Sequence, residues 1–258
     1  MTHSFEMDRR RAMAMAACAL LVPARAMAQP TGLDDLVARH VAARGGAAAL
    51  DRVRSCRIEV EINERGQTLQ GRYAADAAGL VRIDIYVGGN LVYREGVDRE
   101  GVWQWPGDAP APTPSVATGA ANALLHGAEN HLFGLHRFTE RGHRLRRMPD
   151  QTLDGVVYPV IEVIYTTGHT SYFYVDPATY LFARRRDQRA YHPDVDSTVR
   201  RVETRFSDHQ RVEGIVYSNR SDDIDLATGA ALASNRALRR ELNPALPDGL
   251  FARTYTPG

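Results

Sequence analysis

The chain contains no lysine, so every one of its basic residues is an arginine. Its 258 residues include 32 basic side chains against 31 acidic ones, which leaves the net charge close to zero. Proteins that bind nucleic acids carry an excess of positive charge, so this balance argues against DNA or RNA as a partner. The run Arg184-Arg185-Arg186 is then interpreted as the solvated end of a strand.

Cysteine is also scarce, since only Cys18 and Cys56 occur in the chain. Cys18 falls in an N-terminal segment that we expect to be removed, which would leave a product unable to form an internal disulfide. Cys56 begins a run of alternating apolar and polar residues. We therefore interpret it as a small residue of the core.

Several motifs of enzymes are missing as well. The sequence has no G-x-S-x-G elbow, no P-loop and no G-x-G-x-x-G loop, which argues against common hydrolase and nucleotide chemistry. Glycoside hydrolysis by a pair of carboxylates stays an open alternative, because the fold decides which carboxylates lie close together. We expect no cofactor and no enzymatic activity.

Three histidines and one glutamate form the densest set of possible metal ligands, namely His126, Glu129, His131 and His136. His143 lies further along the chain. In a helix, His126 and Glu129 would share a face while His131 would point away from it. The spacing matches no zinc signature. We interpret these side chains as solvated or capping groups, and a metal- or histidine-dependent hydrolase is kept as an alternative function.

The first 28 residues have the three-part pattern of an export signal. Three arginines at 9–11 are followed by the apolar residues 12–24, and Ala26-Met27-Ala28 offers the small residues that signal peptidase reads. The apolar run is shorter than the ~20 residues of a membrane helix. We expect a cleaved signal over 1–28 and a soluble periplasmic product exported by Sec, with the twin-arginine route as an alternative.

From Cys56 onward, the hydrophobic period is two. Ile58, Val60 and Ile62 alternate with polar residues, and turn signals such as Gly88-Gly89-Asn90 separate short sequential strands. We expect helices near 33–41, 47–53 and 116–125, and an antiparallel meander as the main structure of a single domain over 29–258. This pattern predicts a mainly β (α+β) fold, either a sandwich or a curved, barrel-like sheet covered by helices.

Four stretches resemble the LolA-like family of outer-membrane lipoprotein-sorting proteins, and they span most of the expected domain. They are 42–55, which opens with Ala42-Ala43-Arg44-Gly45-Gly46, then 174–181, 207–215 and 242–251. The resemblance implies an incomplete antiparallel β-barrel, closed by helices, around an apolar cavity that holds acyl chains. The chain is longer than the lipoprotein carrier and has the Gly45-Gly46 break, so the resemblance indicates the fold more directly than the cargo.

A cavity of this kind should be lined by large apolar residues of the strands and the middle helix. The candidates are Val60, Ile62, Tyr73, Ile83, Ile85, Trp103, Trp105, Leu124, Leu125 and Phe133. Each buried methylene would contribute about 0.8 kcal/mol, enough to hold an acyl chain reversibly.

The leading hypothesis is a periplasmic carrier for lipid-like or lipoprotein acyl cargo, exchanged with membrane-associated donor and acceptor proteins. The second is a structural or protein-binding envelope protein with a filled barrel.

Overall fold

A computed structural model of the chain describes residues 32–115, 118–192 and 196–255. The expected export signal at 1–28 lies outside these described residues. Within the described ranges, no helix is both long enough and apolar enough to cross a bilayer.

Two runs of strands, separated by a helix, make up most of the described chain. Within each run, successive strands pair antiparallel, as the period-two pattern and the short turns predict. The first run contains β1 (Ser55–Glu64), β2 (Gln67–Asp76), β3 (Val81–Val87), β4 (Asn90–Asp98), β5 (Gly101–Pro106) and β6 (Thr113–Pro114). The second run contains β7 (Arg144–Leu153), β8 (Val156–Ile164), β9 (Thr170–Val175), β10 (Phe182–His192), β11 (Asp196–Val212), β12 (Ile215–Asp225) and β13 (Ala231–Leu242).

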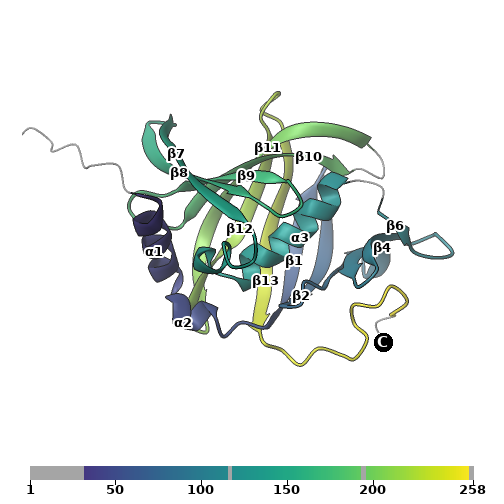
Figure 1. Cartoon of the computed structure of the whole chain (residues 1–258). Helices are drawn as coiled ribbons and strands as arrows, with labels where there is room; N and C mark the ends of the chain where they lie inside the picture. Colours follow the sequence, from purple (N-terminus) through teal and green to yellow (C-terminus); the bar gives the residue numbers. More distant parts are fainter. Residues whose placement is uncertain (1–31, 116–117, 193–195, 256–258) are drawn as a thin grey trace, which may run out of the picture. The chain divides into compact units, whose positions relative to one another are not determined.

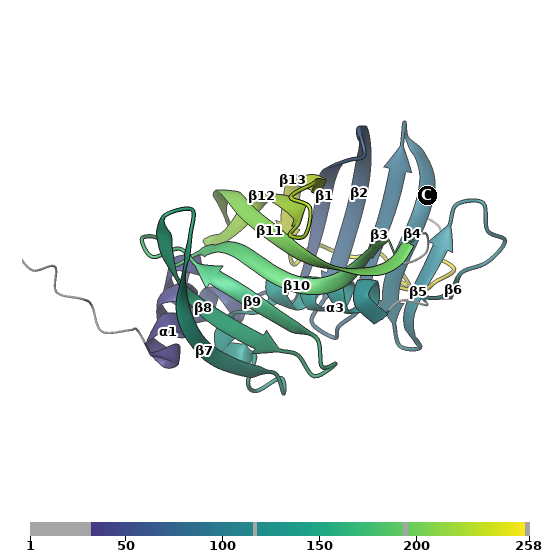
Figure 2. The same ribbon diagram turned by 90° about the horizontal axis from the view of Figure 1, so that it is seen from above.

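The two runs join into one sheet where β1 pairs with β13. The order is β6-β5-β4-β3-β2-β1-β13-β12-β11-β10-β9-β8-β7, and the central pairing runs from Cys56 opposite Leu242 to Glu64 opposite Ala233. Among the described strands, β6 and β7 form the two edges and do not pair with each other, so the sheet is open. Figures 1 and 2 show how strongly it curves. The expected mainly β fold, a curved antiparallel sheet with covering helices, is confirmed.

The helices are α1 (Leu33–Arg44), α2 (Ala47–Leu50), α3 (Thr118–Leu132) and the short 3-10 turn η1 (Leu135–Arg137). Helix α1 ends at Gly45, whose φ of 124° is accessible to glycine but strained for other residues. A Cβ atom on Gly45 would also lie 2.4 Å from the carbonyl oxygen of Gly214. Helix α3 continues past the predicted helix at 116–125, through His126 to Leu132.

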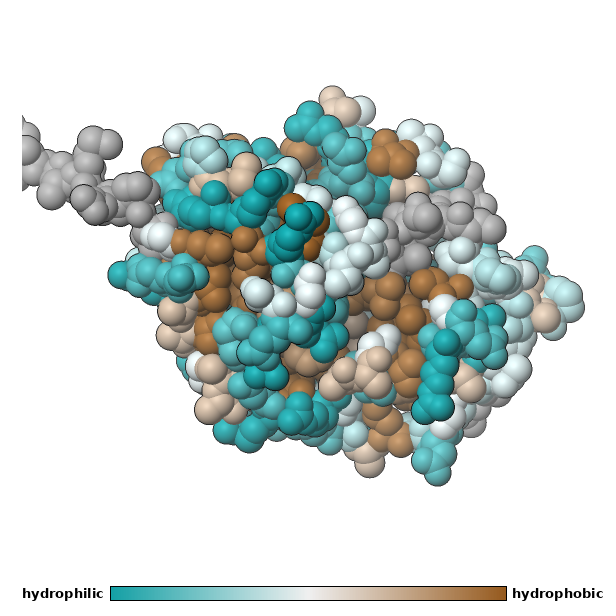
Figure 3. Space-filling model, viewed as in Figure 1, coloured by the Kyte–Doolittle hydropathy of each residue, from teal (hydrophilic) through white to brown (hydrophobic). Residues whose placement is uncertain are grey.

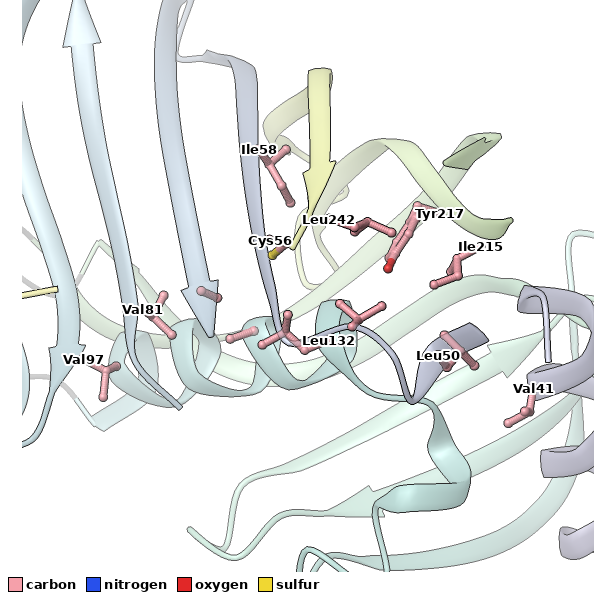
Figure 4. Close-up of a cluster of buried hydrophobic side chains, with 13 residues drawn as sticks. Val41, Leu50, Cys56, Ile58, Val81, Val97, Leu132, Ile215, Tyr217 and Leu242 are labelled. Atoms are coloured by element: carbon pink, nitrogen blue, oxygen red, sulfur yellow. The ribbon is translucent and has the colours of Figure 1, made fainter. Parts of the chain in front are cut away.

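Helix α3 lies against the inner face of the curved sheet and contacts both runs of strands. It packs on β1, β2, β3 and β4 from the first run and on β10 from the second. Its residue Leu132 is buried in a core cluster with Cys56, Val81 and Leu242, which Figure 4 shows between the helix and the strands. Burial of each large side chain contributes about 1.5–3 kcal/mol, so this cluster fixes α3 in place.

A second core cluster holds α1 and η1 against the other end of the sheet. Leu36 of α1, Leu135 of η1 and Phe138 pack on Ile161 of β8 and Phe173 of β9. The helices at the N-terminus and in the middle of the chain therefore cover adjoining parts of the same face, and the space between them and the strands is where a ligand can be held.

Candidate ligand-binding cavity

A cavity of about 420 Å³ lies between the sheet and the helices α1 and α3. Its lining comes from both helices and from strands of both runs. The volume falls in the range of about 300–1,000 Å³ that is typical of small-molecule sites. On the face that carries α1 and α3, Figure 3 shows apolar surface between the polar groups.

One wall of the cavity is apolar and is built by neighbouring positions of β1, β2 and β3. The register places Ile58 beside Tyr73 and Tyr73 beside Ile83, so these side chains share a face of the sheet. Gly71 of β2 leaves room for its neighbour, since a Cβ atom there would lie 2.7 Å from Cγ1 of Val60. Five of the residues predicted from the sequence line this cavity: Val60, Ile62, Tyr73, Ile83 and Leu124.

The two tryptophans predicted for the cavity do not line it. The register aligns Arg82, Gly96 and Trp103 across β3, β4 and β5, one position away from the inward-facing Ile83. Because successive side chains of a strand point to opposite faces, Trp103 lies on the other face of the sheet. There Trp103 is fully buried, with the Arg82 guanidinium carbon 5.7 Å from its ring centroid.

Trp105 lies on the same outer face of the sheet, beside Arg94, whose guanidinium carbon lies 4.1 Å from the centroid of its ring. The indole Nε1 of Trp105 donates a hydrogen bond of 2.8 Å to the carbonyl of Ala109. Trp103 therefore takes part in packing, and Trp105 in packing and in a hydrogen bond, both away from the cavity.

Three further predicted residues also lie outside the cavity lining. Ile85 shares the inner face, where its Cδ1 would lie 3.5 Å from a Cβ atom on Gly71, but it does not line the cavity. Leu125 and Phe133 of the α3 region line a separate space of about 90 Å³. A rotation of about 100° per helical residue separates Leu125 from the cavity-lining Leu124.

The polar part of the lining includes two arginines that the sequence interpretation missed. Arg44, at the C-terminal end of α1, donates from Nη1 to the carbonyls of Asn130 (3.2 Å) and Phe133 (3.3 Å). Arg240 of β13 contacts Nδ1 of His131 at 3.3 Å. Both guanidinium groups also lie over the ring of Tyr217, at 5.1 Å for Arg44 and 4.4 Å for Arg240. Burial lowers the pKa of each arginine.

Neither Arg44 nor Arg240 forms an ion pair with a carboxylate of the described residues. The other cavity arginines do: Arg185 pairs with Asp187 at 3.1 Å, and Arg220 pairs with Asp222 at 3.0 Å. Arg44 is only 7% exposed, so solvent does little to compensate its charge. The cavity therefore contains two uncompensated positive charges.

Several buried polar atoms of the lining have no hydrogen-bond partner among the described residues. They are Nε2 of His40, Oη of Tyr73, Oη of Tyr217 and Nε of Arg240. Buried polar groups are nearly always paired, so such a concentration marks a place where a further partner can bind.

The histidines of the lining are neutral. Burial lowers the pKa of His40 to about 3, with a further contribution from the charge of Arg44. Nδ1 of His40 lies 2.8 Å from the carbonyl oxygen of Tyr180, to which it donates, so Nε2 presents a lone pair. Burial lowers the pKa of His131 as well, and the nearby Arg240 and Arg44 add to this effect. The positive charge of the cavity therefore comes from its arginines.

The four candidate metal ligands are not brought together. His126 and Glu129 do meet, with Nδ1 and Oε2 2.9 Å apart. His131 instead contacts Arg240, and His136 contacts Asp51 at 3.0 Å. In the part of the chain that the structure describes, no three His, Cys, Asp or Glu side chains are arranged to hold a metal ion.

The chain has a LolA-like fold, as the resemblance of its sequence predicts. It is similar to the crystal structure of a LolA superfamily protein from Nitrosomonas europaea, with 10% identity over 86% of this chain and 98% of that one and a TM-score of 0.56. It is also similar to a DUF1329 family protein from Desulfovibrio piger, with 12% identity over 86% and 97% of the two chains and a TM-score of 0.54. Neither family models nor curated protein sequences match the chain. At identities this low, the likeness concerns the fold.

Proposed function

We propose that the protein is a periplasmic carrier that binds a lipid-like molecule or the acyl part of a lipoprotein in the cavity between its sheet and helices. The observation that carries this proposal is the apolar wall of Ile58, Val60, Tyr73 and Ile83 in a cavity of about 420 Å³. Burial of an acyl chain against this wall would contribute about 0.8 kcal/mol per methylene.

The LolA-like fold agrees with this proposal, since a curved sheet covered by helices can enclose an apolar ligand without a complete barrel. Binding requires no chemical step, and the proposal assigns none. Export, suggested by the pattern of residues 1–28, would place the carrier between two membranes, where membrane-associated proteins could supply and accept the cargo.

A structural or protein-binding role with a filled interior is the competing function. It requires side chains to occupy the space between the sheet and α3, whereas a cavity of about 420 Å³ remains there. This space favours the carrier.

The proposal can be tested by mass spectrometry of an organic extract of the natively purified protein, together with titration of the delipidated protein with an apolar fluorescent dye. We expect a co-purified lipid and saturable dye binding. Val60→Trp should fill the cavity and weaken dye binding at least tenfold. Val157→Trp is the matched control, because Val157 is 52% exposed and does not line the cavity. A lipid-free protein that binds no dye would contradict the proposal.

A further inference from the structure

The cavity is amphipathic, with its apolar and its charged linings supplied by different elements. The apolar wall comes from β1, β2 and β3, whereas the uncompensated charges come from Arg44 of α1 and Arg240 of β13. We propose that these two arginines bind the oxyanion head of the cargo, so that the cargo is an amphiphile with one apolar chain and a carboxylate or phosphate head. This inference rests on the proposed carrier function and specifies its ligand.

The two guanidinium groups are positioned before any cargo arrives. Nη1 of Arg44 is held by two carbonyls near the end of α3, and Nη2 of Arg240 donates to the carbonyl of Ser218 at 3.4 Å. Both also lie over the same ring of Tyr217. A site whose donors are already oriented loses less conformational entropy on binding.

Unused hydrogen-bond donors lie beside these charges. Nε of Arg240, Oη of Tyr73 and Oη of Tyr217 are buried and have no partner among the described residues. Burial raises the pKa of Tyr73 and of Tyr217, so both hydroxyls keep their protons and can donate. An oxyanion accepts several hydrogen bonds at once and would satisfy these donors together with the arginines.

A purely structural role explains this arrangement less completely. Arg44 does pair with carbonyls at the end of α3, but those bonds use only its Nη1 nitrogen. Arg240 lies on a strand, the neutral His131 is its only side-chain hydrogen-bond partner among the described residues, and its Nε has no hydrogen-bond partner there. Buried charges without a counter-ion are costly, and an anionic ligand removes that cost.

The size of the cavity sets the number of chains. A volume of about 420 Å³ lies in the lower part of the range of small-molecule sites, which extends to about 1,000 Å³. One acyl chain fits this space better than the two or three chains of a larger lipid.

The test compares ligands that share a chain and differ in the head. The affinities of delipidated protein for palmitate, hexadecyl phosphate and methyl palmitate are measured at pH 7.5 by displacement of an apolar dye. We expect at least one of the two anions to bind about tenfold to a hundredfold more tightly than the neutral ester, as charge-assisted hydrogen bonds of this kind imply. Whichever of the two anions binds more tightly identifies the carboxylate or the phosphate as the natural head group.

Variants assign the effect to the two arginines. Arg240→Gln and Arg44→Gln should each lower the affinity for the tighter-binding anion at least tenfold. The affinity for methyl palmitate should change by no more than about twofold, because only the anion interacts with the positive charge. Arg239→Gln is the matched control, since Arg239 adjoins Arg240 on β13 but does not line the cavity and is paired with Glu241. Circular dichroism checks folding, and Arg240→Gln alone suffices if Arg44→Gln does not fold.

Equal affinity of the wild-type protein for the ester and both anions would overturn the assignment of the head and leave the carrier function intact. An equal loss of anion affinity in Arg240→Gln and Arg239→Gln would also overturn it. Failure of all three ligands and of the dye to bind would instead overturn the carrier function itself.

Discussion

The imidazole of His143 donates from Nε2 to Oε1 of Glu129 across 3.0 Å, which ties the chain just before β7 to helix α3. The backbone N–H of Thr166 donates to Nδ1 of the same ring, which leaves Nε2 as the nitrogen that donates to Glu129. Glu129 also pairs with His126 and with Arg141. A single carboxylate of α3 thus holds three side chains.

Glu129→Gln should therefore loosen α3. Burial alone would raise the pKa of Glu129, but its hydrogen bonds with His126 and His143 hold the pKa below its usual value. The carboxylate consequently stabilises the fold fully above its unfolded pKa, and this contribution is lost as the pH falls through the folded pKa. We expect the variant to lose about 1–3 kcal/mol of unfolding free energy at pH 7. Its unfolding free energy should also fall less steeply as the pH is lowered, measured by urea unfolding from pH 3 to 7.

The exposed Glu140 provides the control for this measurement, since Glu140→Gln should change the unfolding free energy by less than about 0.5 kcal/mol. The same dependence of unfolding free energy on pH in Glu129→Gln and in the wild type would contradict the interpretation.

His40 should make the protein less stable in mild acid. Its folded pKa is lowered to about 3 by burial, whereas an unfolded histidine has a pKa near 6.5. Between these values only the unfolded chain binds the proton, so stability falls by up to about 1.4 kcal/mol per unit as the pH drops below 6.5. Asn at position 40 keeps a donor for the Tyr180 carbonyl but does not titrate. His40→Asn should therefore show a shallower slope from pH 6.5 to 4.5, and an unchanged slope would rule out this role.

Cys56 should be unreactive in the folded protein. It is 1% exposed, and burial raises the pKa of its thiol to about 11, so almost no thiolate is present at pH 8. In a Cys18→Ser background, labelling by a thiol-specific chromophore should follow global unfolding, with a rate that rises with urea as the unfolded population does. Rapid labelling in native buffer would show that the packing around Cys56 opens locally.

Arg82 should hold the C-terminal segment on the outer face of the sheet. It pairs with Asp84 at 2.9 Å and donates to the carbonyls of Leu250, Ala252 and Tyr255. Arg82→Met removes these bonds and leaves the Asp84 carboxylate buried without its partner, which should cost about 3–5 kcal/mol. Limited proteolysis with mass spectrometry should detect faster cleavage within 250–255.

Arg99→Met, at an exposed turn between β4 and β5, is the control for the loss of a positive charge. A protease-resistant C-terminal segment in Arg82→Met would show that other contacts hold it.

The fold could be predicted from the sequence because its signals are local. The alternation of Ile58, Val60 and Ile62 fixes both the strand and its inner face, and the glycines at the turns separate one strand from the next. The extent of α3 was harder to predict, because His126, Asn130 and His131 interrupt its apolar pattern and are satisfied only by tertiary contacts.

The cavity could be predicted only in part. Whether Trp103 points inward depends on its register with Gly96 and Arg82 on neighbouring strands, and no local pattern encodes that register. Arg44 and Arg240 come from opposite ends of the chain and lie over the same ring of Tyr217 because α1 packs against β12, the neighbour of β13. The one available hint was an arginine at the end of a helix, directly before Gly45-Gly46.

The pairing of β1 with β13 also has a consequence for the order of events during synthesis. β13 is the last strand of the described chain, so the middle of the sheet cannot close until Ala231–Leu242 have left the ribosome. Until then β1 has an exposed edge with unpaired backbone groups, and contacts this distant in sequence form slowly. The edge of β1 in the nascent protein therefore stays open, and in need of protection from aggregation, until β13 has been made.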